Sequence, residues 1–288
     1  MCTIVSLKKS KLNLLRELNS LKDNFNTQNN DFFDVYDDLN FMQQLFYRKR
    51  VKFLKKGLNY IGYIWSTHGS KTNCVINSLY LPPNSSKQCF DKLLSALQKP
   101  NNVEYICEKN VFNFYDLEKV GFTKKSGTLE LKLLINDFLP LKYIDVVNFE
   151  VLKKDCQEAI RCKIQNEVFE NDDRIPLNIE DMYFDQAQSY YLEEGAIFIK
   201  NNLSYVGYGQ IIIEKDYVTV VNFGIINSFR RKGYGKLLLT KLLNIVKSLG
   251  YNKVSIKVAS KNTAALKLYK DLGFSIIGEI CNFELKTK

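Results

Sequence analysis

The chain has 288 residues, of which 45% are hydrophobic and 25% are charged, and it carries a formal net charge of +10. This length accommodates two ordinary domains, and the composition is that of a globular protein with a substantial core. No apolar run reaches the ~18 residues of a membrane span, and the N-terminal stretch lacks the apolar segment and cleavage site of a secretion signal. We therefore expect a cytoplasmic protein without a membrane partner.

Most of the excess positive charge lies in the first half of the chain. Residues 1–137 contain 20 basic and 13 acidic residues, and the stretch RKRVKFLKK at 48–56 supplies six of these cations. Such a stretch suits either an anionic partner or a solvated helix face or strand edge. Because no nucleic-acid-binding motif accompanies it, we do not expect a nucleic-acid partner, and the role of the stretch stays open.

The sequence contains no pattern typical of a metal site or a disulfide framework. Its seven cysteines include no CxxC pair, and His68 is its one histidine. Cysteines in a chain without a secretion signal are normally reduced, and one histidine cannot build a histidine-rich metal site. We expect no metal and place His68 in a surface loop.

The two halves of the chain contain similar segments in the same order, which indicates a duplicated unit. The joint falls near Pro140, where a new strand pattern begins. We therefore predict two domains, at 1–137 and 138–288. The matching pairs are LNYIGYIW (58–65) with LSYVGYGQ (203–210), LPPNSSKQCFDKLL (81–94) with IINSFRRKGYGKLL (225–238), and DLEKVGF (116–122) with LYKDLGF (268–274).

Each half has the pattern of a mixed α/β domain. In the second half, three consecutive runs rich in Val, Ile, Tyr and Phe predict a meander of strands at 196–202, 203–215 and 217–226. A helix with a broad apolar face follows and stops at Gly250. We predict an α/β (α+β) fold in which each domain has a mixed, mostly antiparallel sheet flanked by helices.

The end of the chain continues this pattern. NKVSIKVA (252–259) alternates as a strand, and Asn262 can cap a short helix that stops at Gly273. FSIIGEI and NFELKTK, which follow, predict a closing hairpin.

The stretch RRKGYGK at 230–236 stands between a predicted strand and a predicted helix. A helix N-terminus carries partial positive charge and free N–H groups, so it binds phosphate well. Gly233 and Gly235 would let the amides converge without side chains, and the flanking cations add charge. The stretch therefore predicts a site for a pyrophosphate. The Walker pattern is missing, and the dinucleotide fingerprint does not fit a loop after a late strand.

The same stretch resembles the acyl-CoA loop of the GNAT acetyltransferase family, written [QR]-x-x-G-x-[GA]. Each fixed position is matched by Arg230, Gly233 and Gly235. NFGIINSFRR before the loop resembles the strand that leads into it. NTAALKLYKDLGF (262–274) resembles the next motif of the family, with an Asn at the helix start and a Tyr before a GF. The resemblance covers 143–288 strongly and the first half faintly.

The resemblance implies acyl transfer from acetyl-CoA, as cosubstrate, directly to an amine. The backbone of Phe223, Gly224 and Ile225 would pair with the pantetheine arm, and an amide there would polarise the thioester carbonyl. Asn262 would also contact the arm. The loop would hold the pyrophosphate through Arg230, Arg231, Lys232, Gly233, Tyr234, Gly235 and Lys236.

In the family motif, Tyr269 corresponds to the general acid that protonates the leaving thiolate. A phenol has an unperturbed pKa of about 10, so it is protonated at neutral pH. The alternative interpretation of Tyr269 is a tyrosine that only packs a helix face. The alternative interpretation of Asn262 is a residue that only caps the helix. The base is open, because Thr219 stands where many family members have a glutamate. Glu214 and Asp216 are alternatives that also suit solvated turns.

The resemblance implies a small-molecule or peptide amine as the acceptor. The segment after the first helix of the second half is acidic, and in the family this region lines the acceptor side. Carboxylates there would favour a cationic acceptor, but a solvated surface loop is the simpler interpretation. They are Glu167, Glu170, Asp172, Asp173, Glu180, Asp181 and Asp185.

In the first half, SKQCFD (86–91) occupies the place of the loop. Both glycines are missing, Asp91 stands where Gly235 is, and Leu117 replaces Tyr269. We expect a domain that kept the fold and lost the cofactor. Two alternatives remain for the whole chain: a GNAT-fold transferase with another acyl group, or a CoA-binding sensor or docking protein without turnover. The oligomeric state stays open.

Overall fold

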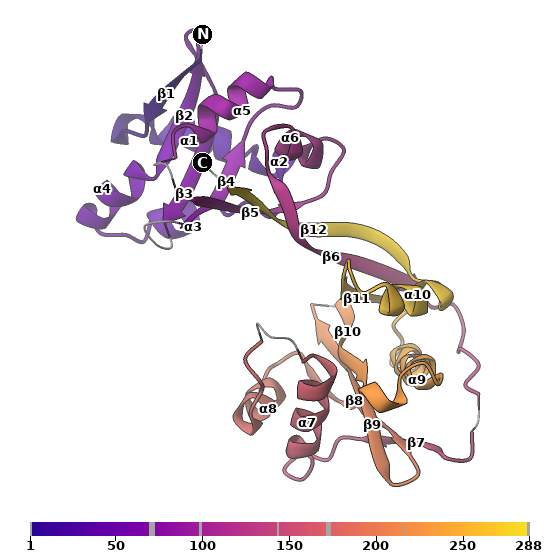
Figure 1. Cartoon of the computed structure of the whole chain (residues 1–288). Coiled ribbons are helices and arrows are strands. Elements are labelled where there is room, and N and C mark those ends of the chain that lie inside the picture. The colour runs from indigo at the N-terminus through magenta and orange to yellow at the C-terminus, as the bar shows by residue number, and fades with distance from the viewer. Residues whose placement is uncertain are drawn as a thin grey trace. The chain divides into compact units, whose positions relative to one another are not determined.

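The computed structural model describes residues 2–68, 73–97, 100–142, 144–170, 174–215 and 217–286. The chain forms two compact units. Unit 1 comprises Met1–Thr128 and Gly278–Lys288, and unit 2 comprises Leu129–Ile277 (Figure 1). Within the described part of the chain, no helix is long and apolar enough to cross a membrane.

Unit 1 is a sheet with short helices packed against it. Its strands run in the order β1-β2-β3-β4-β5-β12-β6, with β4 and β5 parallel. The core is aromatic, and Phe53, Tyr63 and Tyr105 are buried in it. The elements are β1 (Cys2–Ser6), η1 (Lys9–Lys11), α1 (Leu12–Asn19), α2 (Lys22–Phe25), α3 (Phe33–Tyr36), α4 (Phe41–Lys49), β2 (Val51–Lys56), β3 (Asn59–His68), β4 (Asn73–Tyr80), α5 (Lys87–Leu94), β5 (Asn102–Glu108), α6 (Asn113–Lys119) and β6 (Thr123–Leu134).

Unit 2 repeats this arrangement, with strands in the order β12-β6-β11-β10-β9-β8-β7. Helix α9 buries Leu238, Leu242 and Leu243 completely against the sheet, as its apolar spacing predicted. The elements are β7 (Val147–Val151), α7 (Glu158–Val168), α8 (Ile179–Gln186), β8 (Tyr191–Asn201), β9 (Ser204–Glu214), β10 (Tyr217–Ile225), η2 (Asn227–Phe229), α9 (Tyr234–Ser248), β11 (Lys253–Ala259), α10 (Thr263–Asp271) and β12 (Ser275–Lys286).

The fold class expected from the sequence is confirmed. The predicted meander is β8, β9 and β10, which are antiparallel neighbours, while β10 and β11 are parallel. The duplication is also visible in the structure at Gly62 and Gly207, which occupy equivalent positions in the two repeats. A Cβ on Gly62 would lie 2.3 Å from Tyr80 O, and one on Gly207 would lie 2.7 Å from Gly224 O. In both units a bare glycine lets the end of the next strand approach.

Strands β6 and β12 are each shared between the units. Ile280–Lys286 of β12 pairs with β5 of unit 1, and Cys281 and Phe283 are buried in the core of that unit. Leu129 and Leu131 of β6 are buried in the core of unit 2. The hairpin expected from FSIIGEI and NFELKTK is therefore wrong, because both segments belong to one continuous strand.

The unit boundaries also differ from the expected ranges 1–137 and 138–288, at residues 129–137 and 278–288. The cause is the length of the two strands: β6 begins in unit 1 and gives its core residues to unit 2, and β12 begins in unit 2 and gives its core residues to unit 1. His68, expected in a loop, is the exposed last residue of β3.

Candidate active site

Strands β10 and β11 separate in the middle of the sheet of unit 2. They pair only through Thr219 with Ser255 and Val220 with Ile256, although β10 continues to Ile225 and β11 to Ala259. Beyond Val220, the edge of β10 that faces β11 therefore lacks a strand partner. Unpaired backbone groups of this kind can accept an extended ligand as an added strand.

A β-bulge shapes this unpaired edge. The register with β9 shifts between Val221 and Gly224, and Asn222 takes a positive φ of 52°. The Asn222 amide donates to Gln210 Oε1 over 3.1 Å. Bulges re-aim side chains, and here Phe223 lies beside Tyr269 of α10, with 6.1 Å between the ring centroids.

The glycine loop follows directly after η2. Gly233 has a φ of 89°, which is a left-handed conformation, and it is the N-cap of α9. No side chain caps this helix, so the N–H groups of its first turn keep their hydrogen-bonding capacity. A Cβ on Gly235 would lie 3.3 Å from Leu268 Cδ2. The structure thus places the two glycines as the sequence predicted, at a bare helix N-terminus.

The basic side chains of the loop have different surroundings. Arg230 is engaged, because its Nε donates to Ile225 O over 2.8 Å and its Nη2 to Val168 O over 3.1 Å. Lys232 Nζ lies 5.2 Å from the ring centroid of Phe229. Arg231 and Lys236 are exposed. Arg230 therefore ties the loop to the ends of β10 and α7, and the other three cations remain available for an anion.

The remaining predicted residues lie on or beside α10 and α9. Tyr269 is only 4% exposed, and burial raises the pKa of its phenol. Asn262 caps α10 by accepting from Ala265 N over 3.1 Å, and its side chain is exposed. Tyr234 is 9% exposed and packs edge-on against Phe229, so it offers only its backbone.

The structure brings no predicted base to the bulge. Thr219 lies in the paired part of β10, and Glu214 is exposed at the end of β9. Asp216 lies outside the described residues.

A buried polar cluster at the bulge was missed from the sequence. Arg161 of α7 is 1% exposed and donates to Asp185 Oδ2 over 2.6 Å and to Gln210 Oε1 over 3.0 Å. Gln210 in turn accepts from Asn222. A polar residue at the centre of an apolar strand was the available signal, since buried polar groups are normally paired.

Three of the acidic residues on the expected acceptor side, Glu167, Asp181 and Asp185, are engaged within the protein. Asp181 accepts from Asn178 N in a capping box, and Asp185 pairs with Arg161. Glu170 and Glu180 are exposed. Glu167 accepts from Asn227 N over 3.3 Å, and Asp172 and Asp173 lie outside the described residues.

In unit 1 the corresponding space between strands is filled by the chain itself. Strands β4 and β5 pair from Asn73 to Ile76 and then diverge. Asn29 donates to Leu79 O over 2.9 Å and accepts from Leu79 N over 3.1 Å. Asn26 bridges β5 in the same way, donating to Ile106 O and accepting from Glu108 N. We call residues 26–30 the plug, because its carboxamides occupy both facing strand edges.

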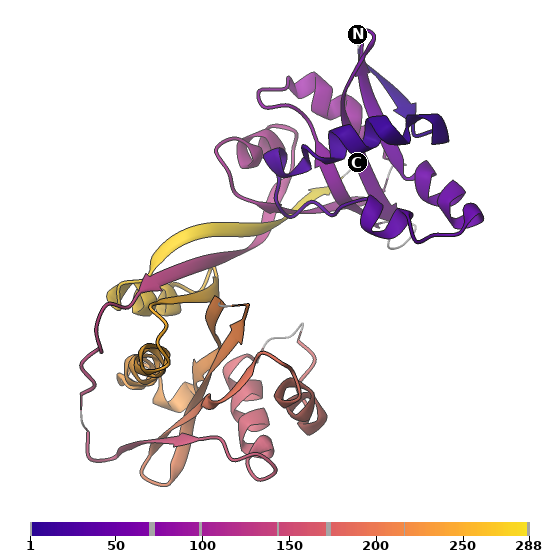
Figure 2. The same ribbon diagram turned by 180° about the vertical axis from the view of Figure 1, so that it is seen from behind.

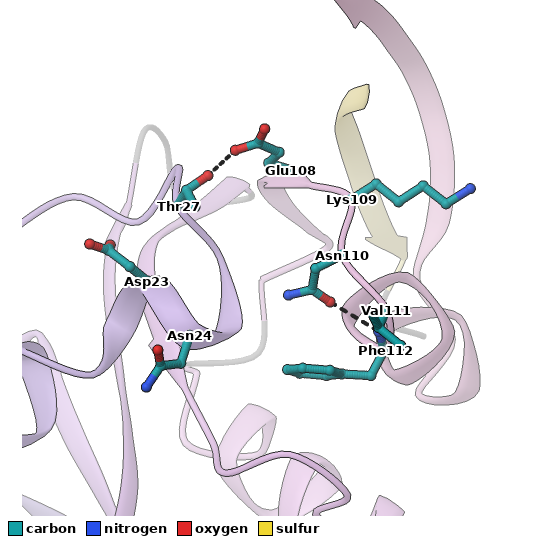
Figure 3. Close-up of a pocket in the computed structure, with 8 residues that line it drawn as sticks. All are labelled: Asp23, Asn24, Thr27, Glu108, Lys109, Asn110, Val111 and Phe112. Atoms are coloured by element: carbon teal, nitrogen blue, oxygen red, sulfur yellow. Dashed lines mark hydrogen bonds between the residues drawn. The ribbon is translucent and has the colours of Figure 1, made fainter. Parts of the chain in front are cut away.

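A cavity of about 350 Å³ lies beside the plug (Figure 3). Its walls come from α2, the plug and the segment after β5, where Thr27 donates to Glu108 and Asn110 Oδ1 accepts from Phe112 N. It shares no residue with the glycine loop of unit 2. Leu117, the counterpart of Tyr269, is 1% exposed in the core.

Comparison with known proteins matches residues 160–274 to the acetyltransferase (GNAT) family. The [ribosomal protein bS18]-alanine N-acetyltransferase of Haemophilus ducreyi is 37% identical over 62 residues, which are 22% of this chain and 43% of that protein. The uncharacterized N-acetyltransferase CgeE of Bacillus subtilis is 34% identical over 92 residues, 32% of this chain and 30% of that protein. The chain thus spans less than half the length of these relatives.

Solved structures resemble the whole chain in fold. A GCN5-related N-acetyltransferase from Sphaerobacter thermophilus gives a TM-score of 0.60 at 10% identity, covering 98% of this chain and 95% of that one. A tandem GNAT protein from the clavulanic acid biosynthesis pathway gives 0.52 at 11% identity, covering 99% and 98%. Residues 160–274, which carry the open strand edge and the glycine loop, are therefore a domain of the GNAT acetyltransferase family.

Proposed function

We propose that this protein transfers an acetyl group from acetyl-CoA directly to a primary amine, and that unit 2 carries the reaction. The observation that carries the proposal is the unpaired edge of β10, which leads to the bare N-terminus of α9. An extended arm that ends in a diphosphate needs these two features in this order.

The residues present fit this cosubstrate. Phe223, Gly224 and Ile225 lie beyond the last pair of β10 with β11, so a pantetheine arm would pair along this edge, beside the Ile225 carbonyl that Arg230 already holds. Gly233 and Gly235 carry no side chain of their own at this helix start, and the exposed Arg231, Lys232 and Lys236 flank them. The Asn262 carboxamide donor is left for the arm, because only its oxygen is used in capping α10.

Acetyl-CoA would supply an activated acyl thioester, and Tyr269 would supply the proton. The amine nitrogen bonds to the acetyl carbon while the carbon–sulfur bond breaks, and the phenol protonates the leaving sulfur. Because burial raises the pKa of Tyr269, the phenol stays protonated at neutral pH. Thr219 cannot act as a base; the amine therefore either arrives deprotonated or gives up its proton to water, and Tyr269 regains its proton from water after the thiol leaves.

The acceptor is a primary amine on a small molecule or a peptide. The match to alanine N-acetyltransferases supports including peptide N-termini in the screen. Exposed Glu170 and Glu180 would attract a cationic acceptor, whereas Asp181 and Asp185 are engaged within the protein. If Glu170→Gln with Glu180→Gln leaves KM for the best amine unchanged, the cationic preference is wrong.

We also propose that unit 1 is a degenerate copy that binds no cofactor. The plug supports this, because its carboxamides already hold the strand edges that a pantetheine arm would need. Asp91, the counterpart of Gly235 in the sequence repeat, lies exposed in the second turn of α5, so unit 1 also lacks a glycine loop at this helix start.

Calorimetric titration of acetyl-CoA tests both proposals through the stoichiometry. We expect one site per chain, abolished by Gly235→Asp. A carboxylate near a helix N-terminus stabilises the helix, so this variant should fold while its charge repels the diphosphate. Asp91→Asn, the matched change in unit 1, should leave the titration unchanged. Two sites per chain would refute the role of the plug, and no binding would refute the transferase.

A second measurement separates turnover from sensing. Release of free CoA in the presence of an amine panel should require the intact loop and Tyr269. Tight binding without release by any amine would favour a sensor. Release of free CoA from another acyl thioester, but not from acetyl-CoA, would mean that the enzyme transfers a different acyl group from the same site.

A further inference from the structure

Helix α4 of unit 1 exposes four apolar side chains, while Tyr47 and Arg48 face the interior of the unit. Phe41 is 65% exposed, Met42 56%, Leu45 38% and Phe46 56%. We call these four residues the α4 face. Apolar residues of a surface helix normally point to the core, so a contiguous exposed set marks an interaction surface.

The inward side of α4 shows that this orientation is fixed. Arg48 is 7% exposed and donates to the Tyr36 hydroxyl over 2.5 Å, and Gln44 donates to Tyr36 O over 3.3 Å. A capping box between Asn40 and Gln43 holds the start of the helix. Rotating the helix to bury the α4 face would break these bonds, so the face is built to point outward.

The ends of α4 carry opposite charges. Asp37 and Asp38 precede the helix and are exposed, and Lys49 and Arg50 at its end are exposed too. Asp37 is paired with Arg16. Among the described residues, Asp38, Lys49 and Arg50 take part in no ion pair that the structure shows. The surface is therefore apolar in the middle, acidic at one end and basic at the other.

This surface is self-complementary when the α4 helices of two copies of the chain pack antiparallel. A two-fold axis through the middle of the face places the acidic end of one helix against the basic end of the other. Lys49 already lies 5.1 Å from the ring centroid of Phe46, so its charge stands at the rim of the apolar set. An anionic membrane or an acidic partner would meet both charge signs and fits less well. Both ribbon views draw α4 at the margin of unit 1 (Figures 1 and 2).

We propose that the α4 face joins two copies of this chain across a two-fold axis, with α4 packed antiparallel on its copy and Asp38 opposite Lys49 and Arg50 of the other. Nine residues of helix span only about 14 Å, so the interface is small. A weak dimer with a dissociation constant on the order of 10–100 µM is expected. The proposal does not depend on acetyl transfer.

Sedimentation velocity of the full chain over about 5–300 µM tests it. The wild type should pass from monomer to dimer, and Phe46→Glu should remain monomeric because it places a carboxylate in the apolar contact. Leu58→Glu is the matched control, since Leu58 is 88% exposed in the turn between β2 and β3. It should dimerise like the wild type.

A charge exchange tests the two-fold geometry itself. Asp38→Lys and Lys49→Glu should each weaken the dimer about tenfold, because each places like charges opposite one another. The chain carrying both changes should regain most of the lost affinity. A monomer at every concentration, a dimer that survives Phe46→Glu, or a double variant no better than the single ones would each overturn the proposal.

Discussion

Gly224 in β10 lies directly against Val168 at the end of α7: a Cβ on Gly224 would stand 2.1 Å from Val168 Cγ1. The helix therefore presses on the bulge that shapes the candidate site, and no larger residue fits there without movement.

The first prediction concerns this contact. Gly224→Ala should cost about 1–3 kcal/mol of unfolding free energy by overpacking, and it should reduce kcat/KM for acetyl-CoA because the bulge shifts. Urea denaturation and initial rates measure the two effects. Adding Val168→Ala should recover part of both. A Gly224→Ala variant with unchanged stability would contradict the close approach.

Removal of the Tyr269 hydroxyl should affect the chemical step more than binding. Tyr269→Phe keeps the ring against Phe223 and Phe274, so the stability and the KM for acetyl-CoA should change little. The kcat should fall roughly 100- to 10,000-fold, the usual range for a general acid. Steady-state kinetics decide the matter, and an unchanged kcat would remove Tyr269 from the mechanism.

The pH profile offers an independent check on Tyr269. The active form is the protonated phenol, and burial raises its pKa above the ordinary value of about 10. The alkaline decline caused by its ionisation should therefore begin above pH ~10. A decline of kcat near pH 8 or 9 that vanishes in Tyr269→Phe would contradict the raised pKa.

Glu150 should make the protein sensitive to acid. Hydrogen bonds from Lys200 and from Gln157, opposed by some desolvation, lower the pKa of Glu150 to about 2. A lowered pKa in the folded state stabilises the fold above the unfolded value of about 4.5, and this contribution disappears as the pH falls toward 2. Because the pair is partly solvated, we expect about 1 kcal/mol. The unfolding free energy of Glu150→Gln, measured from pH 6 down to about 2, should fall less steeply with decreasing pH than that of the wild type. Equal slopes for the two proteins would refute this role of Glu150.

The plug should be a strong contributor to the stability of unit 1. Asn29 is 6% exposed, and its replacement by Ala would leave both backbone groups of Leu79 without partners, at a cost of about 2–4 kcal/mol. Asn24→Ala, an exposed asparagine on the wall of the neighbouring cavity, should change stability little. Thermal unfolding compares the two, and the acetyl-CoA stoichiometry should stay at one in both.

The sequence predicted those parts of the site whose geometry is set locally. A glycine before an apolar run predicted the start of α9, and an asparagine before a short amphipathic run predicted the cap of α10. Both depend on backbone conformation within a few residues, and both are confirmed.

Features that depend on distant partners were not accessible in this way. The plug has the polar sequence NTQNN, which is also typical of a solvated turn. Nothing in this sequence indicates that its side chains bind the backbone of β4 and β5. In the sequence Arg230 looked like a free cation. In the structure it donates to Ile225 O, at the other end of its own loop, and to Val168 O, which is distant in the sequence. The outward face of α4 was also hidden, since helical periodicity does not say which side meets the core.

Sharing β6 and β12 has a consequence for how the chain is made. Most of unit 1 is translated first, but β5, which pairs with β4 on one side, lacks its second neighbour until residues 280–286 have left the ribosome. During that time β5 is an unpaired edge that can capture another strand. Unit 1 is therefore begun first and completed last, so a chain that ends at Ile277 should keep unit 2 folded and destabilise unit 1.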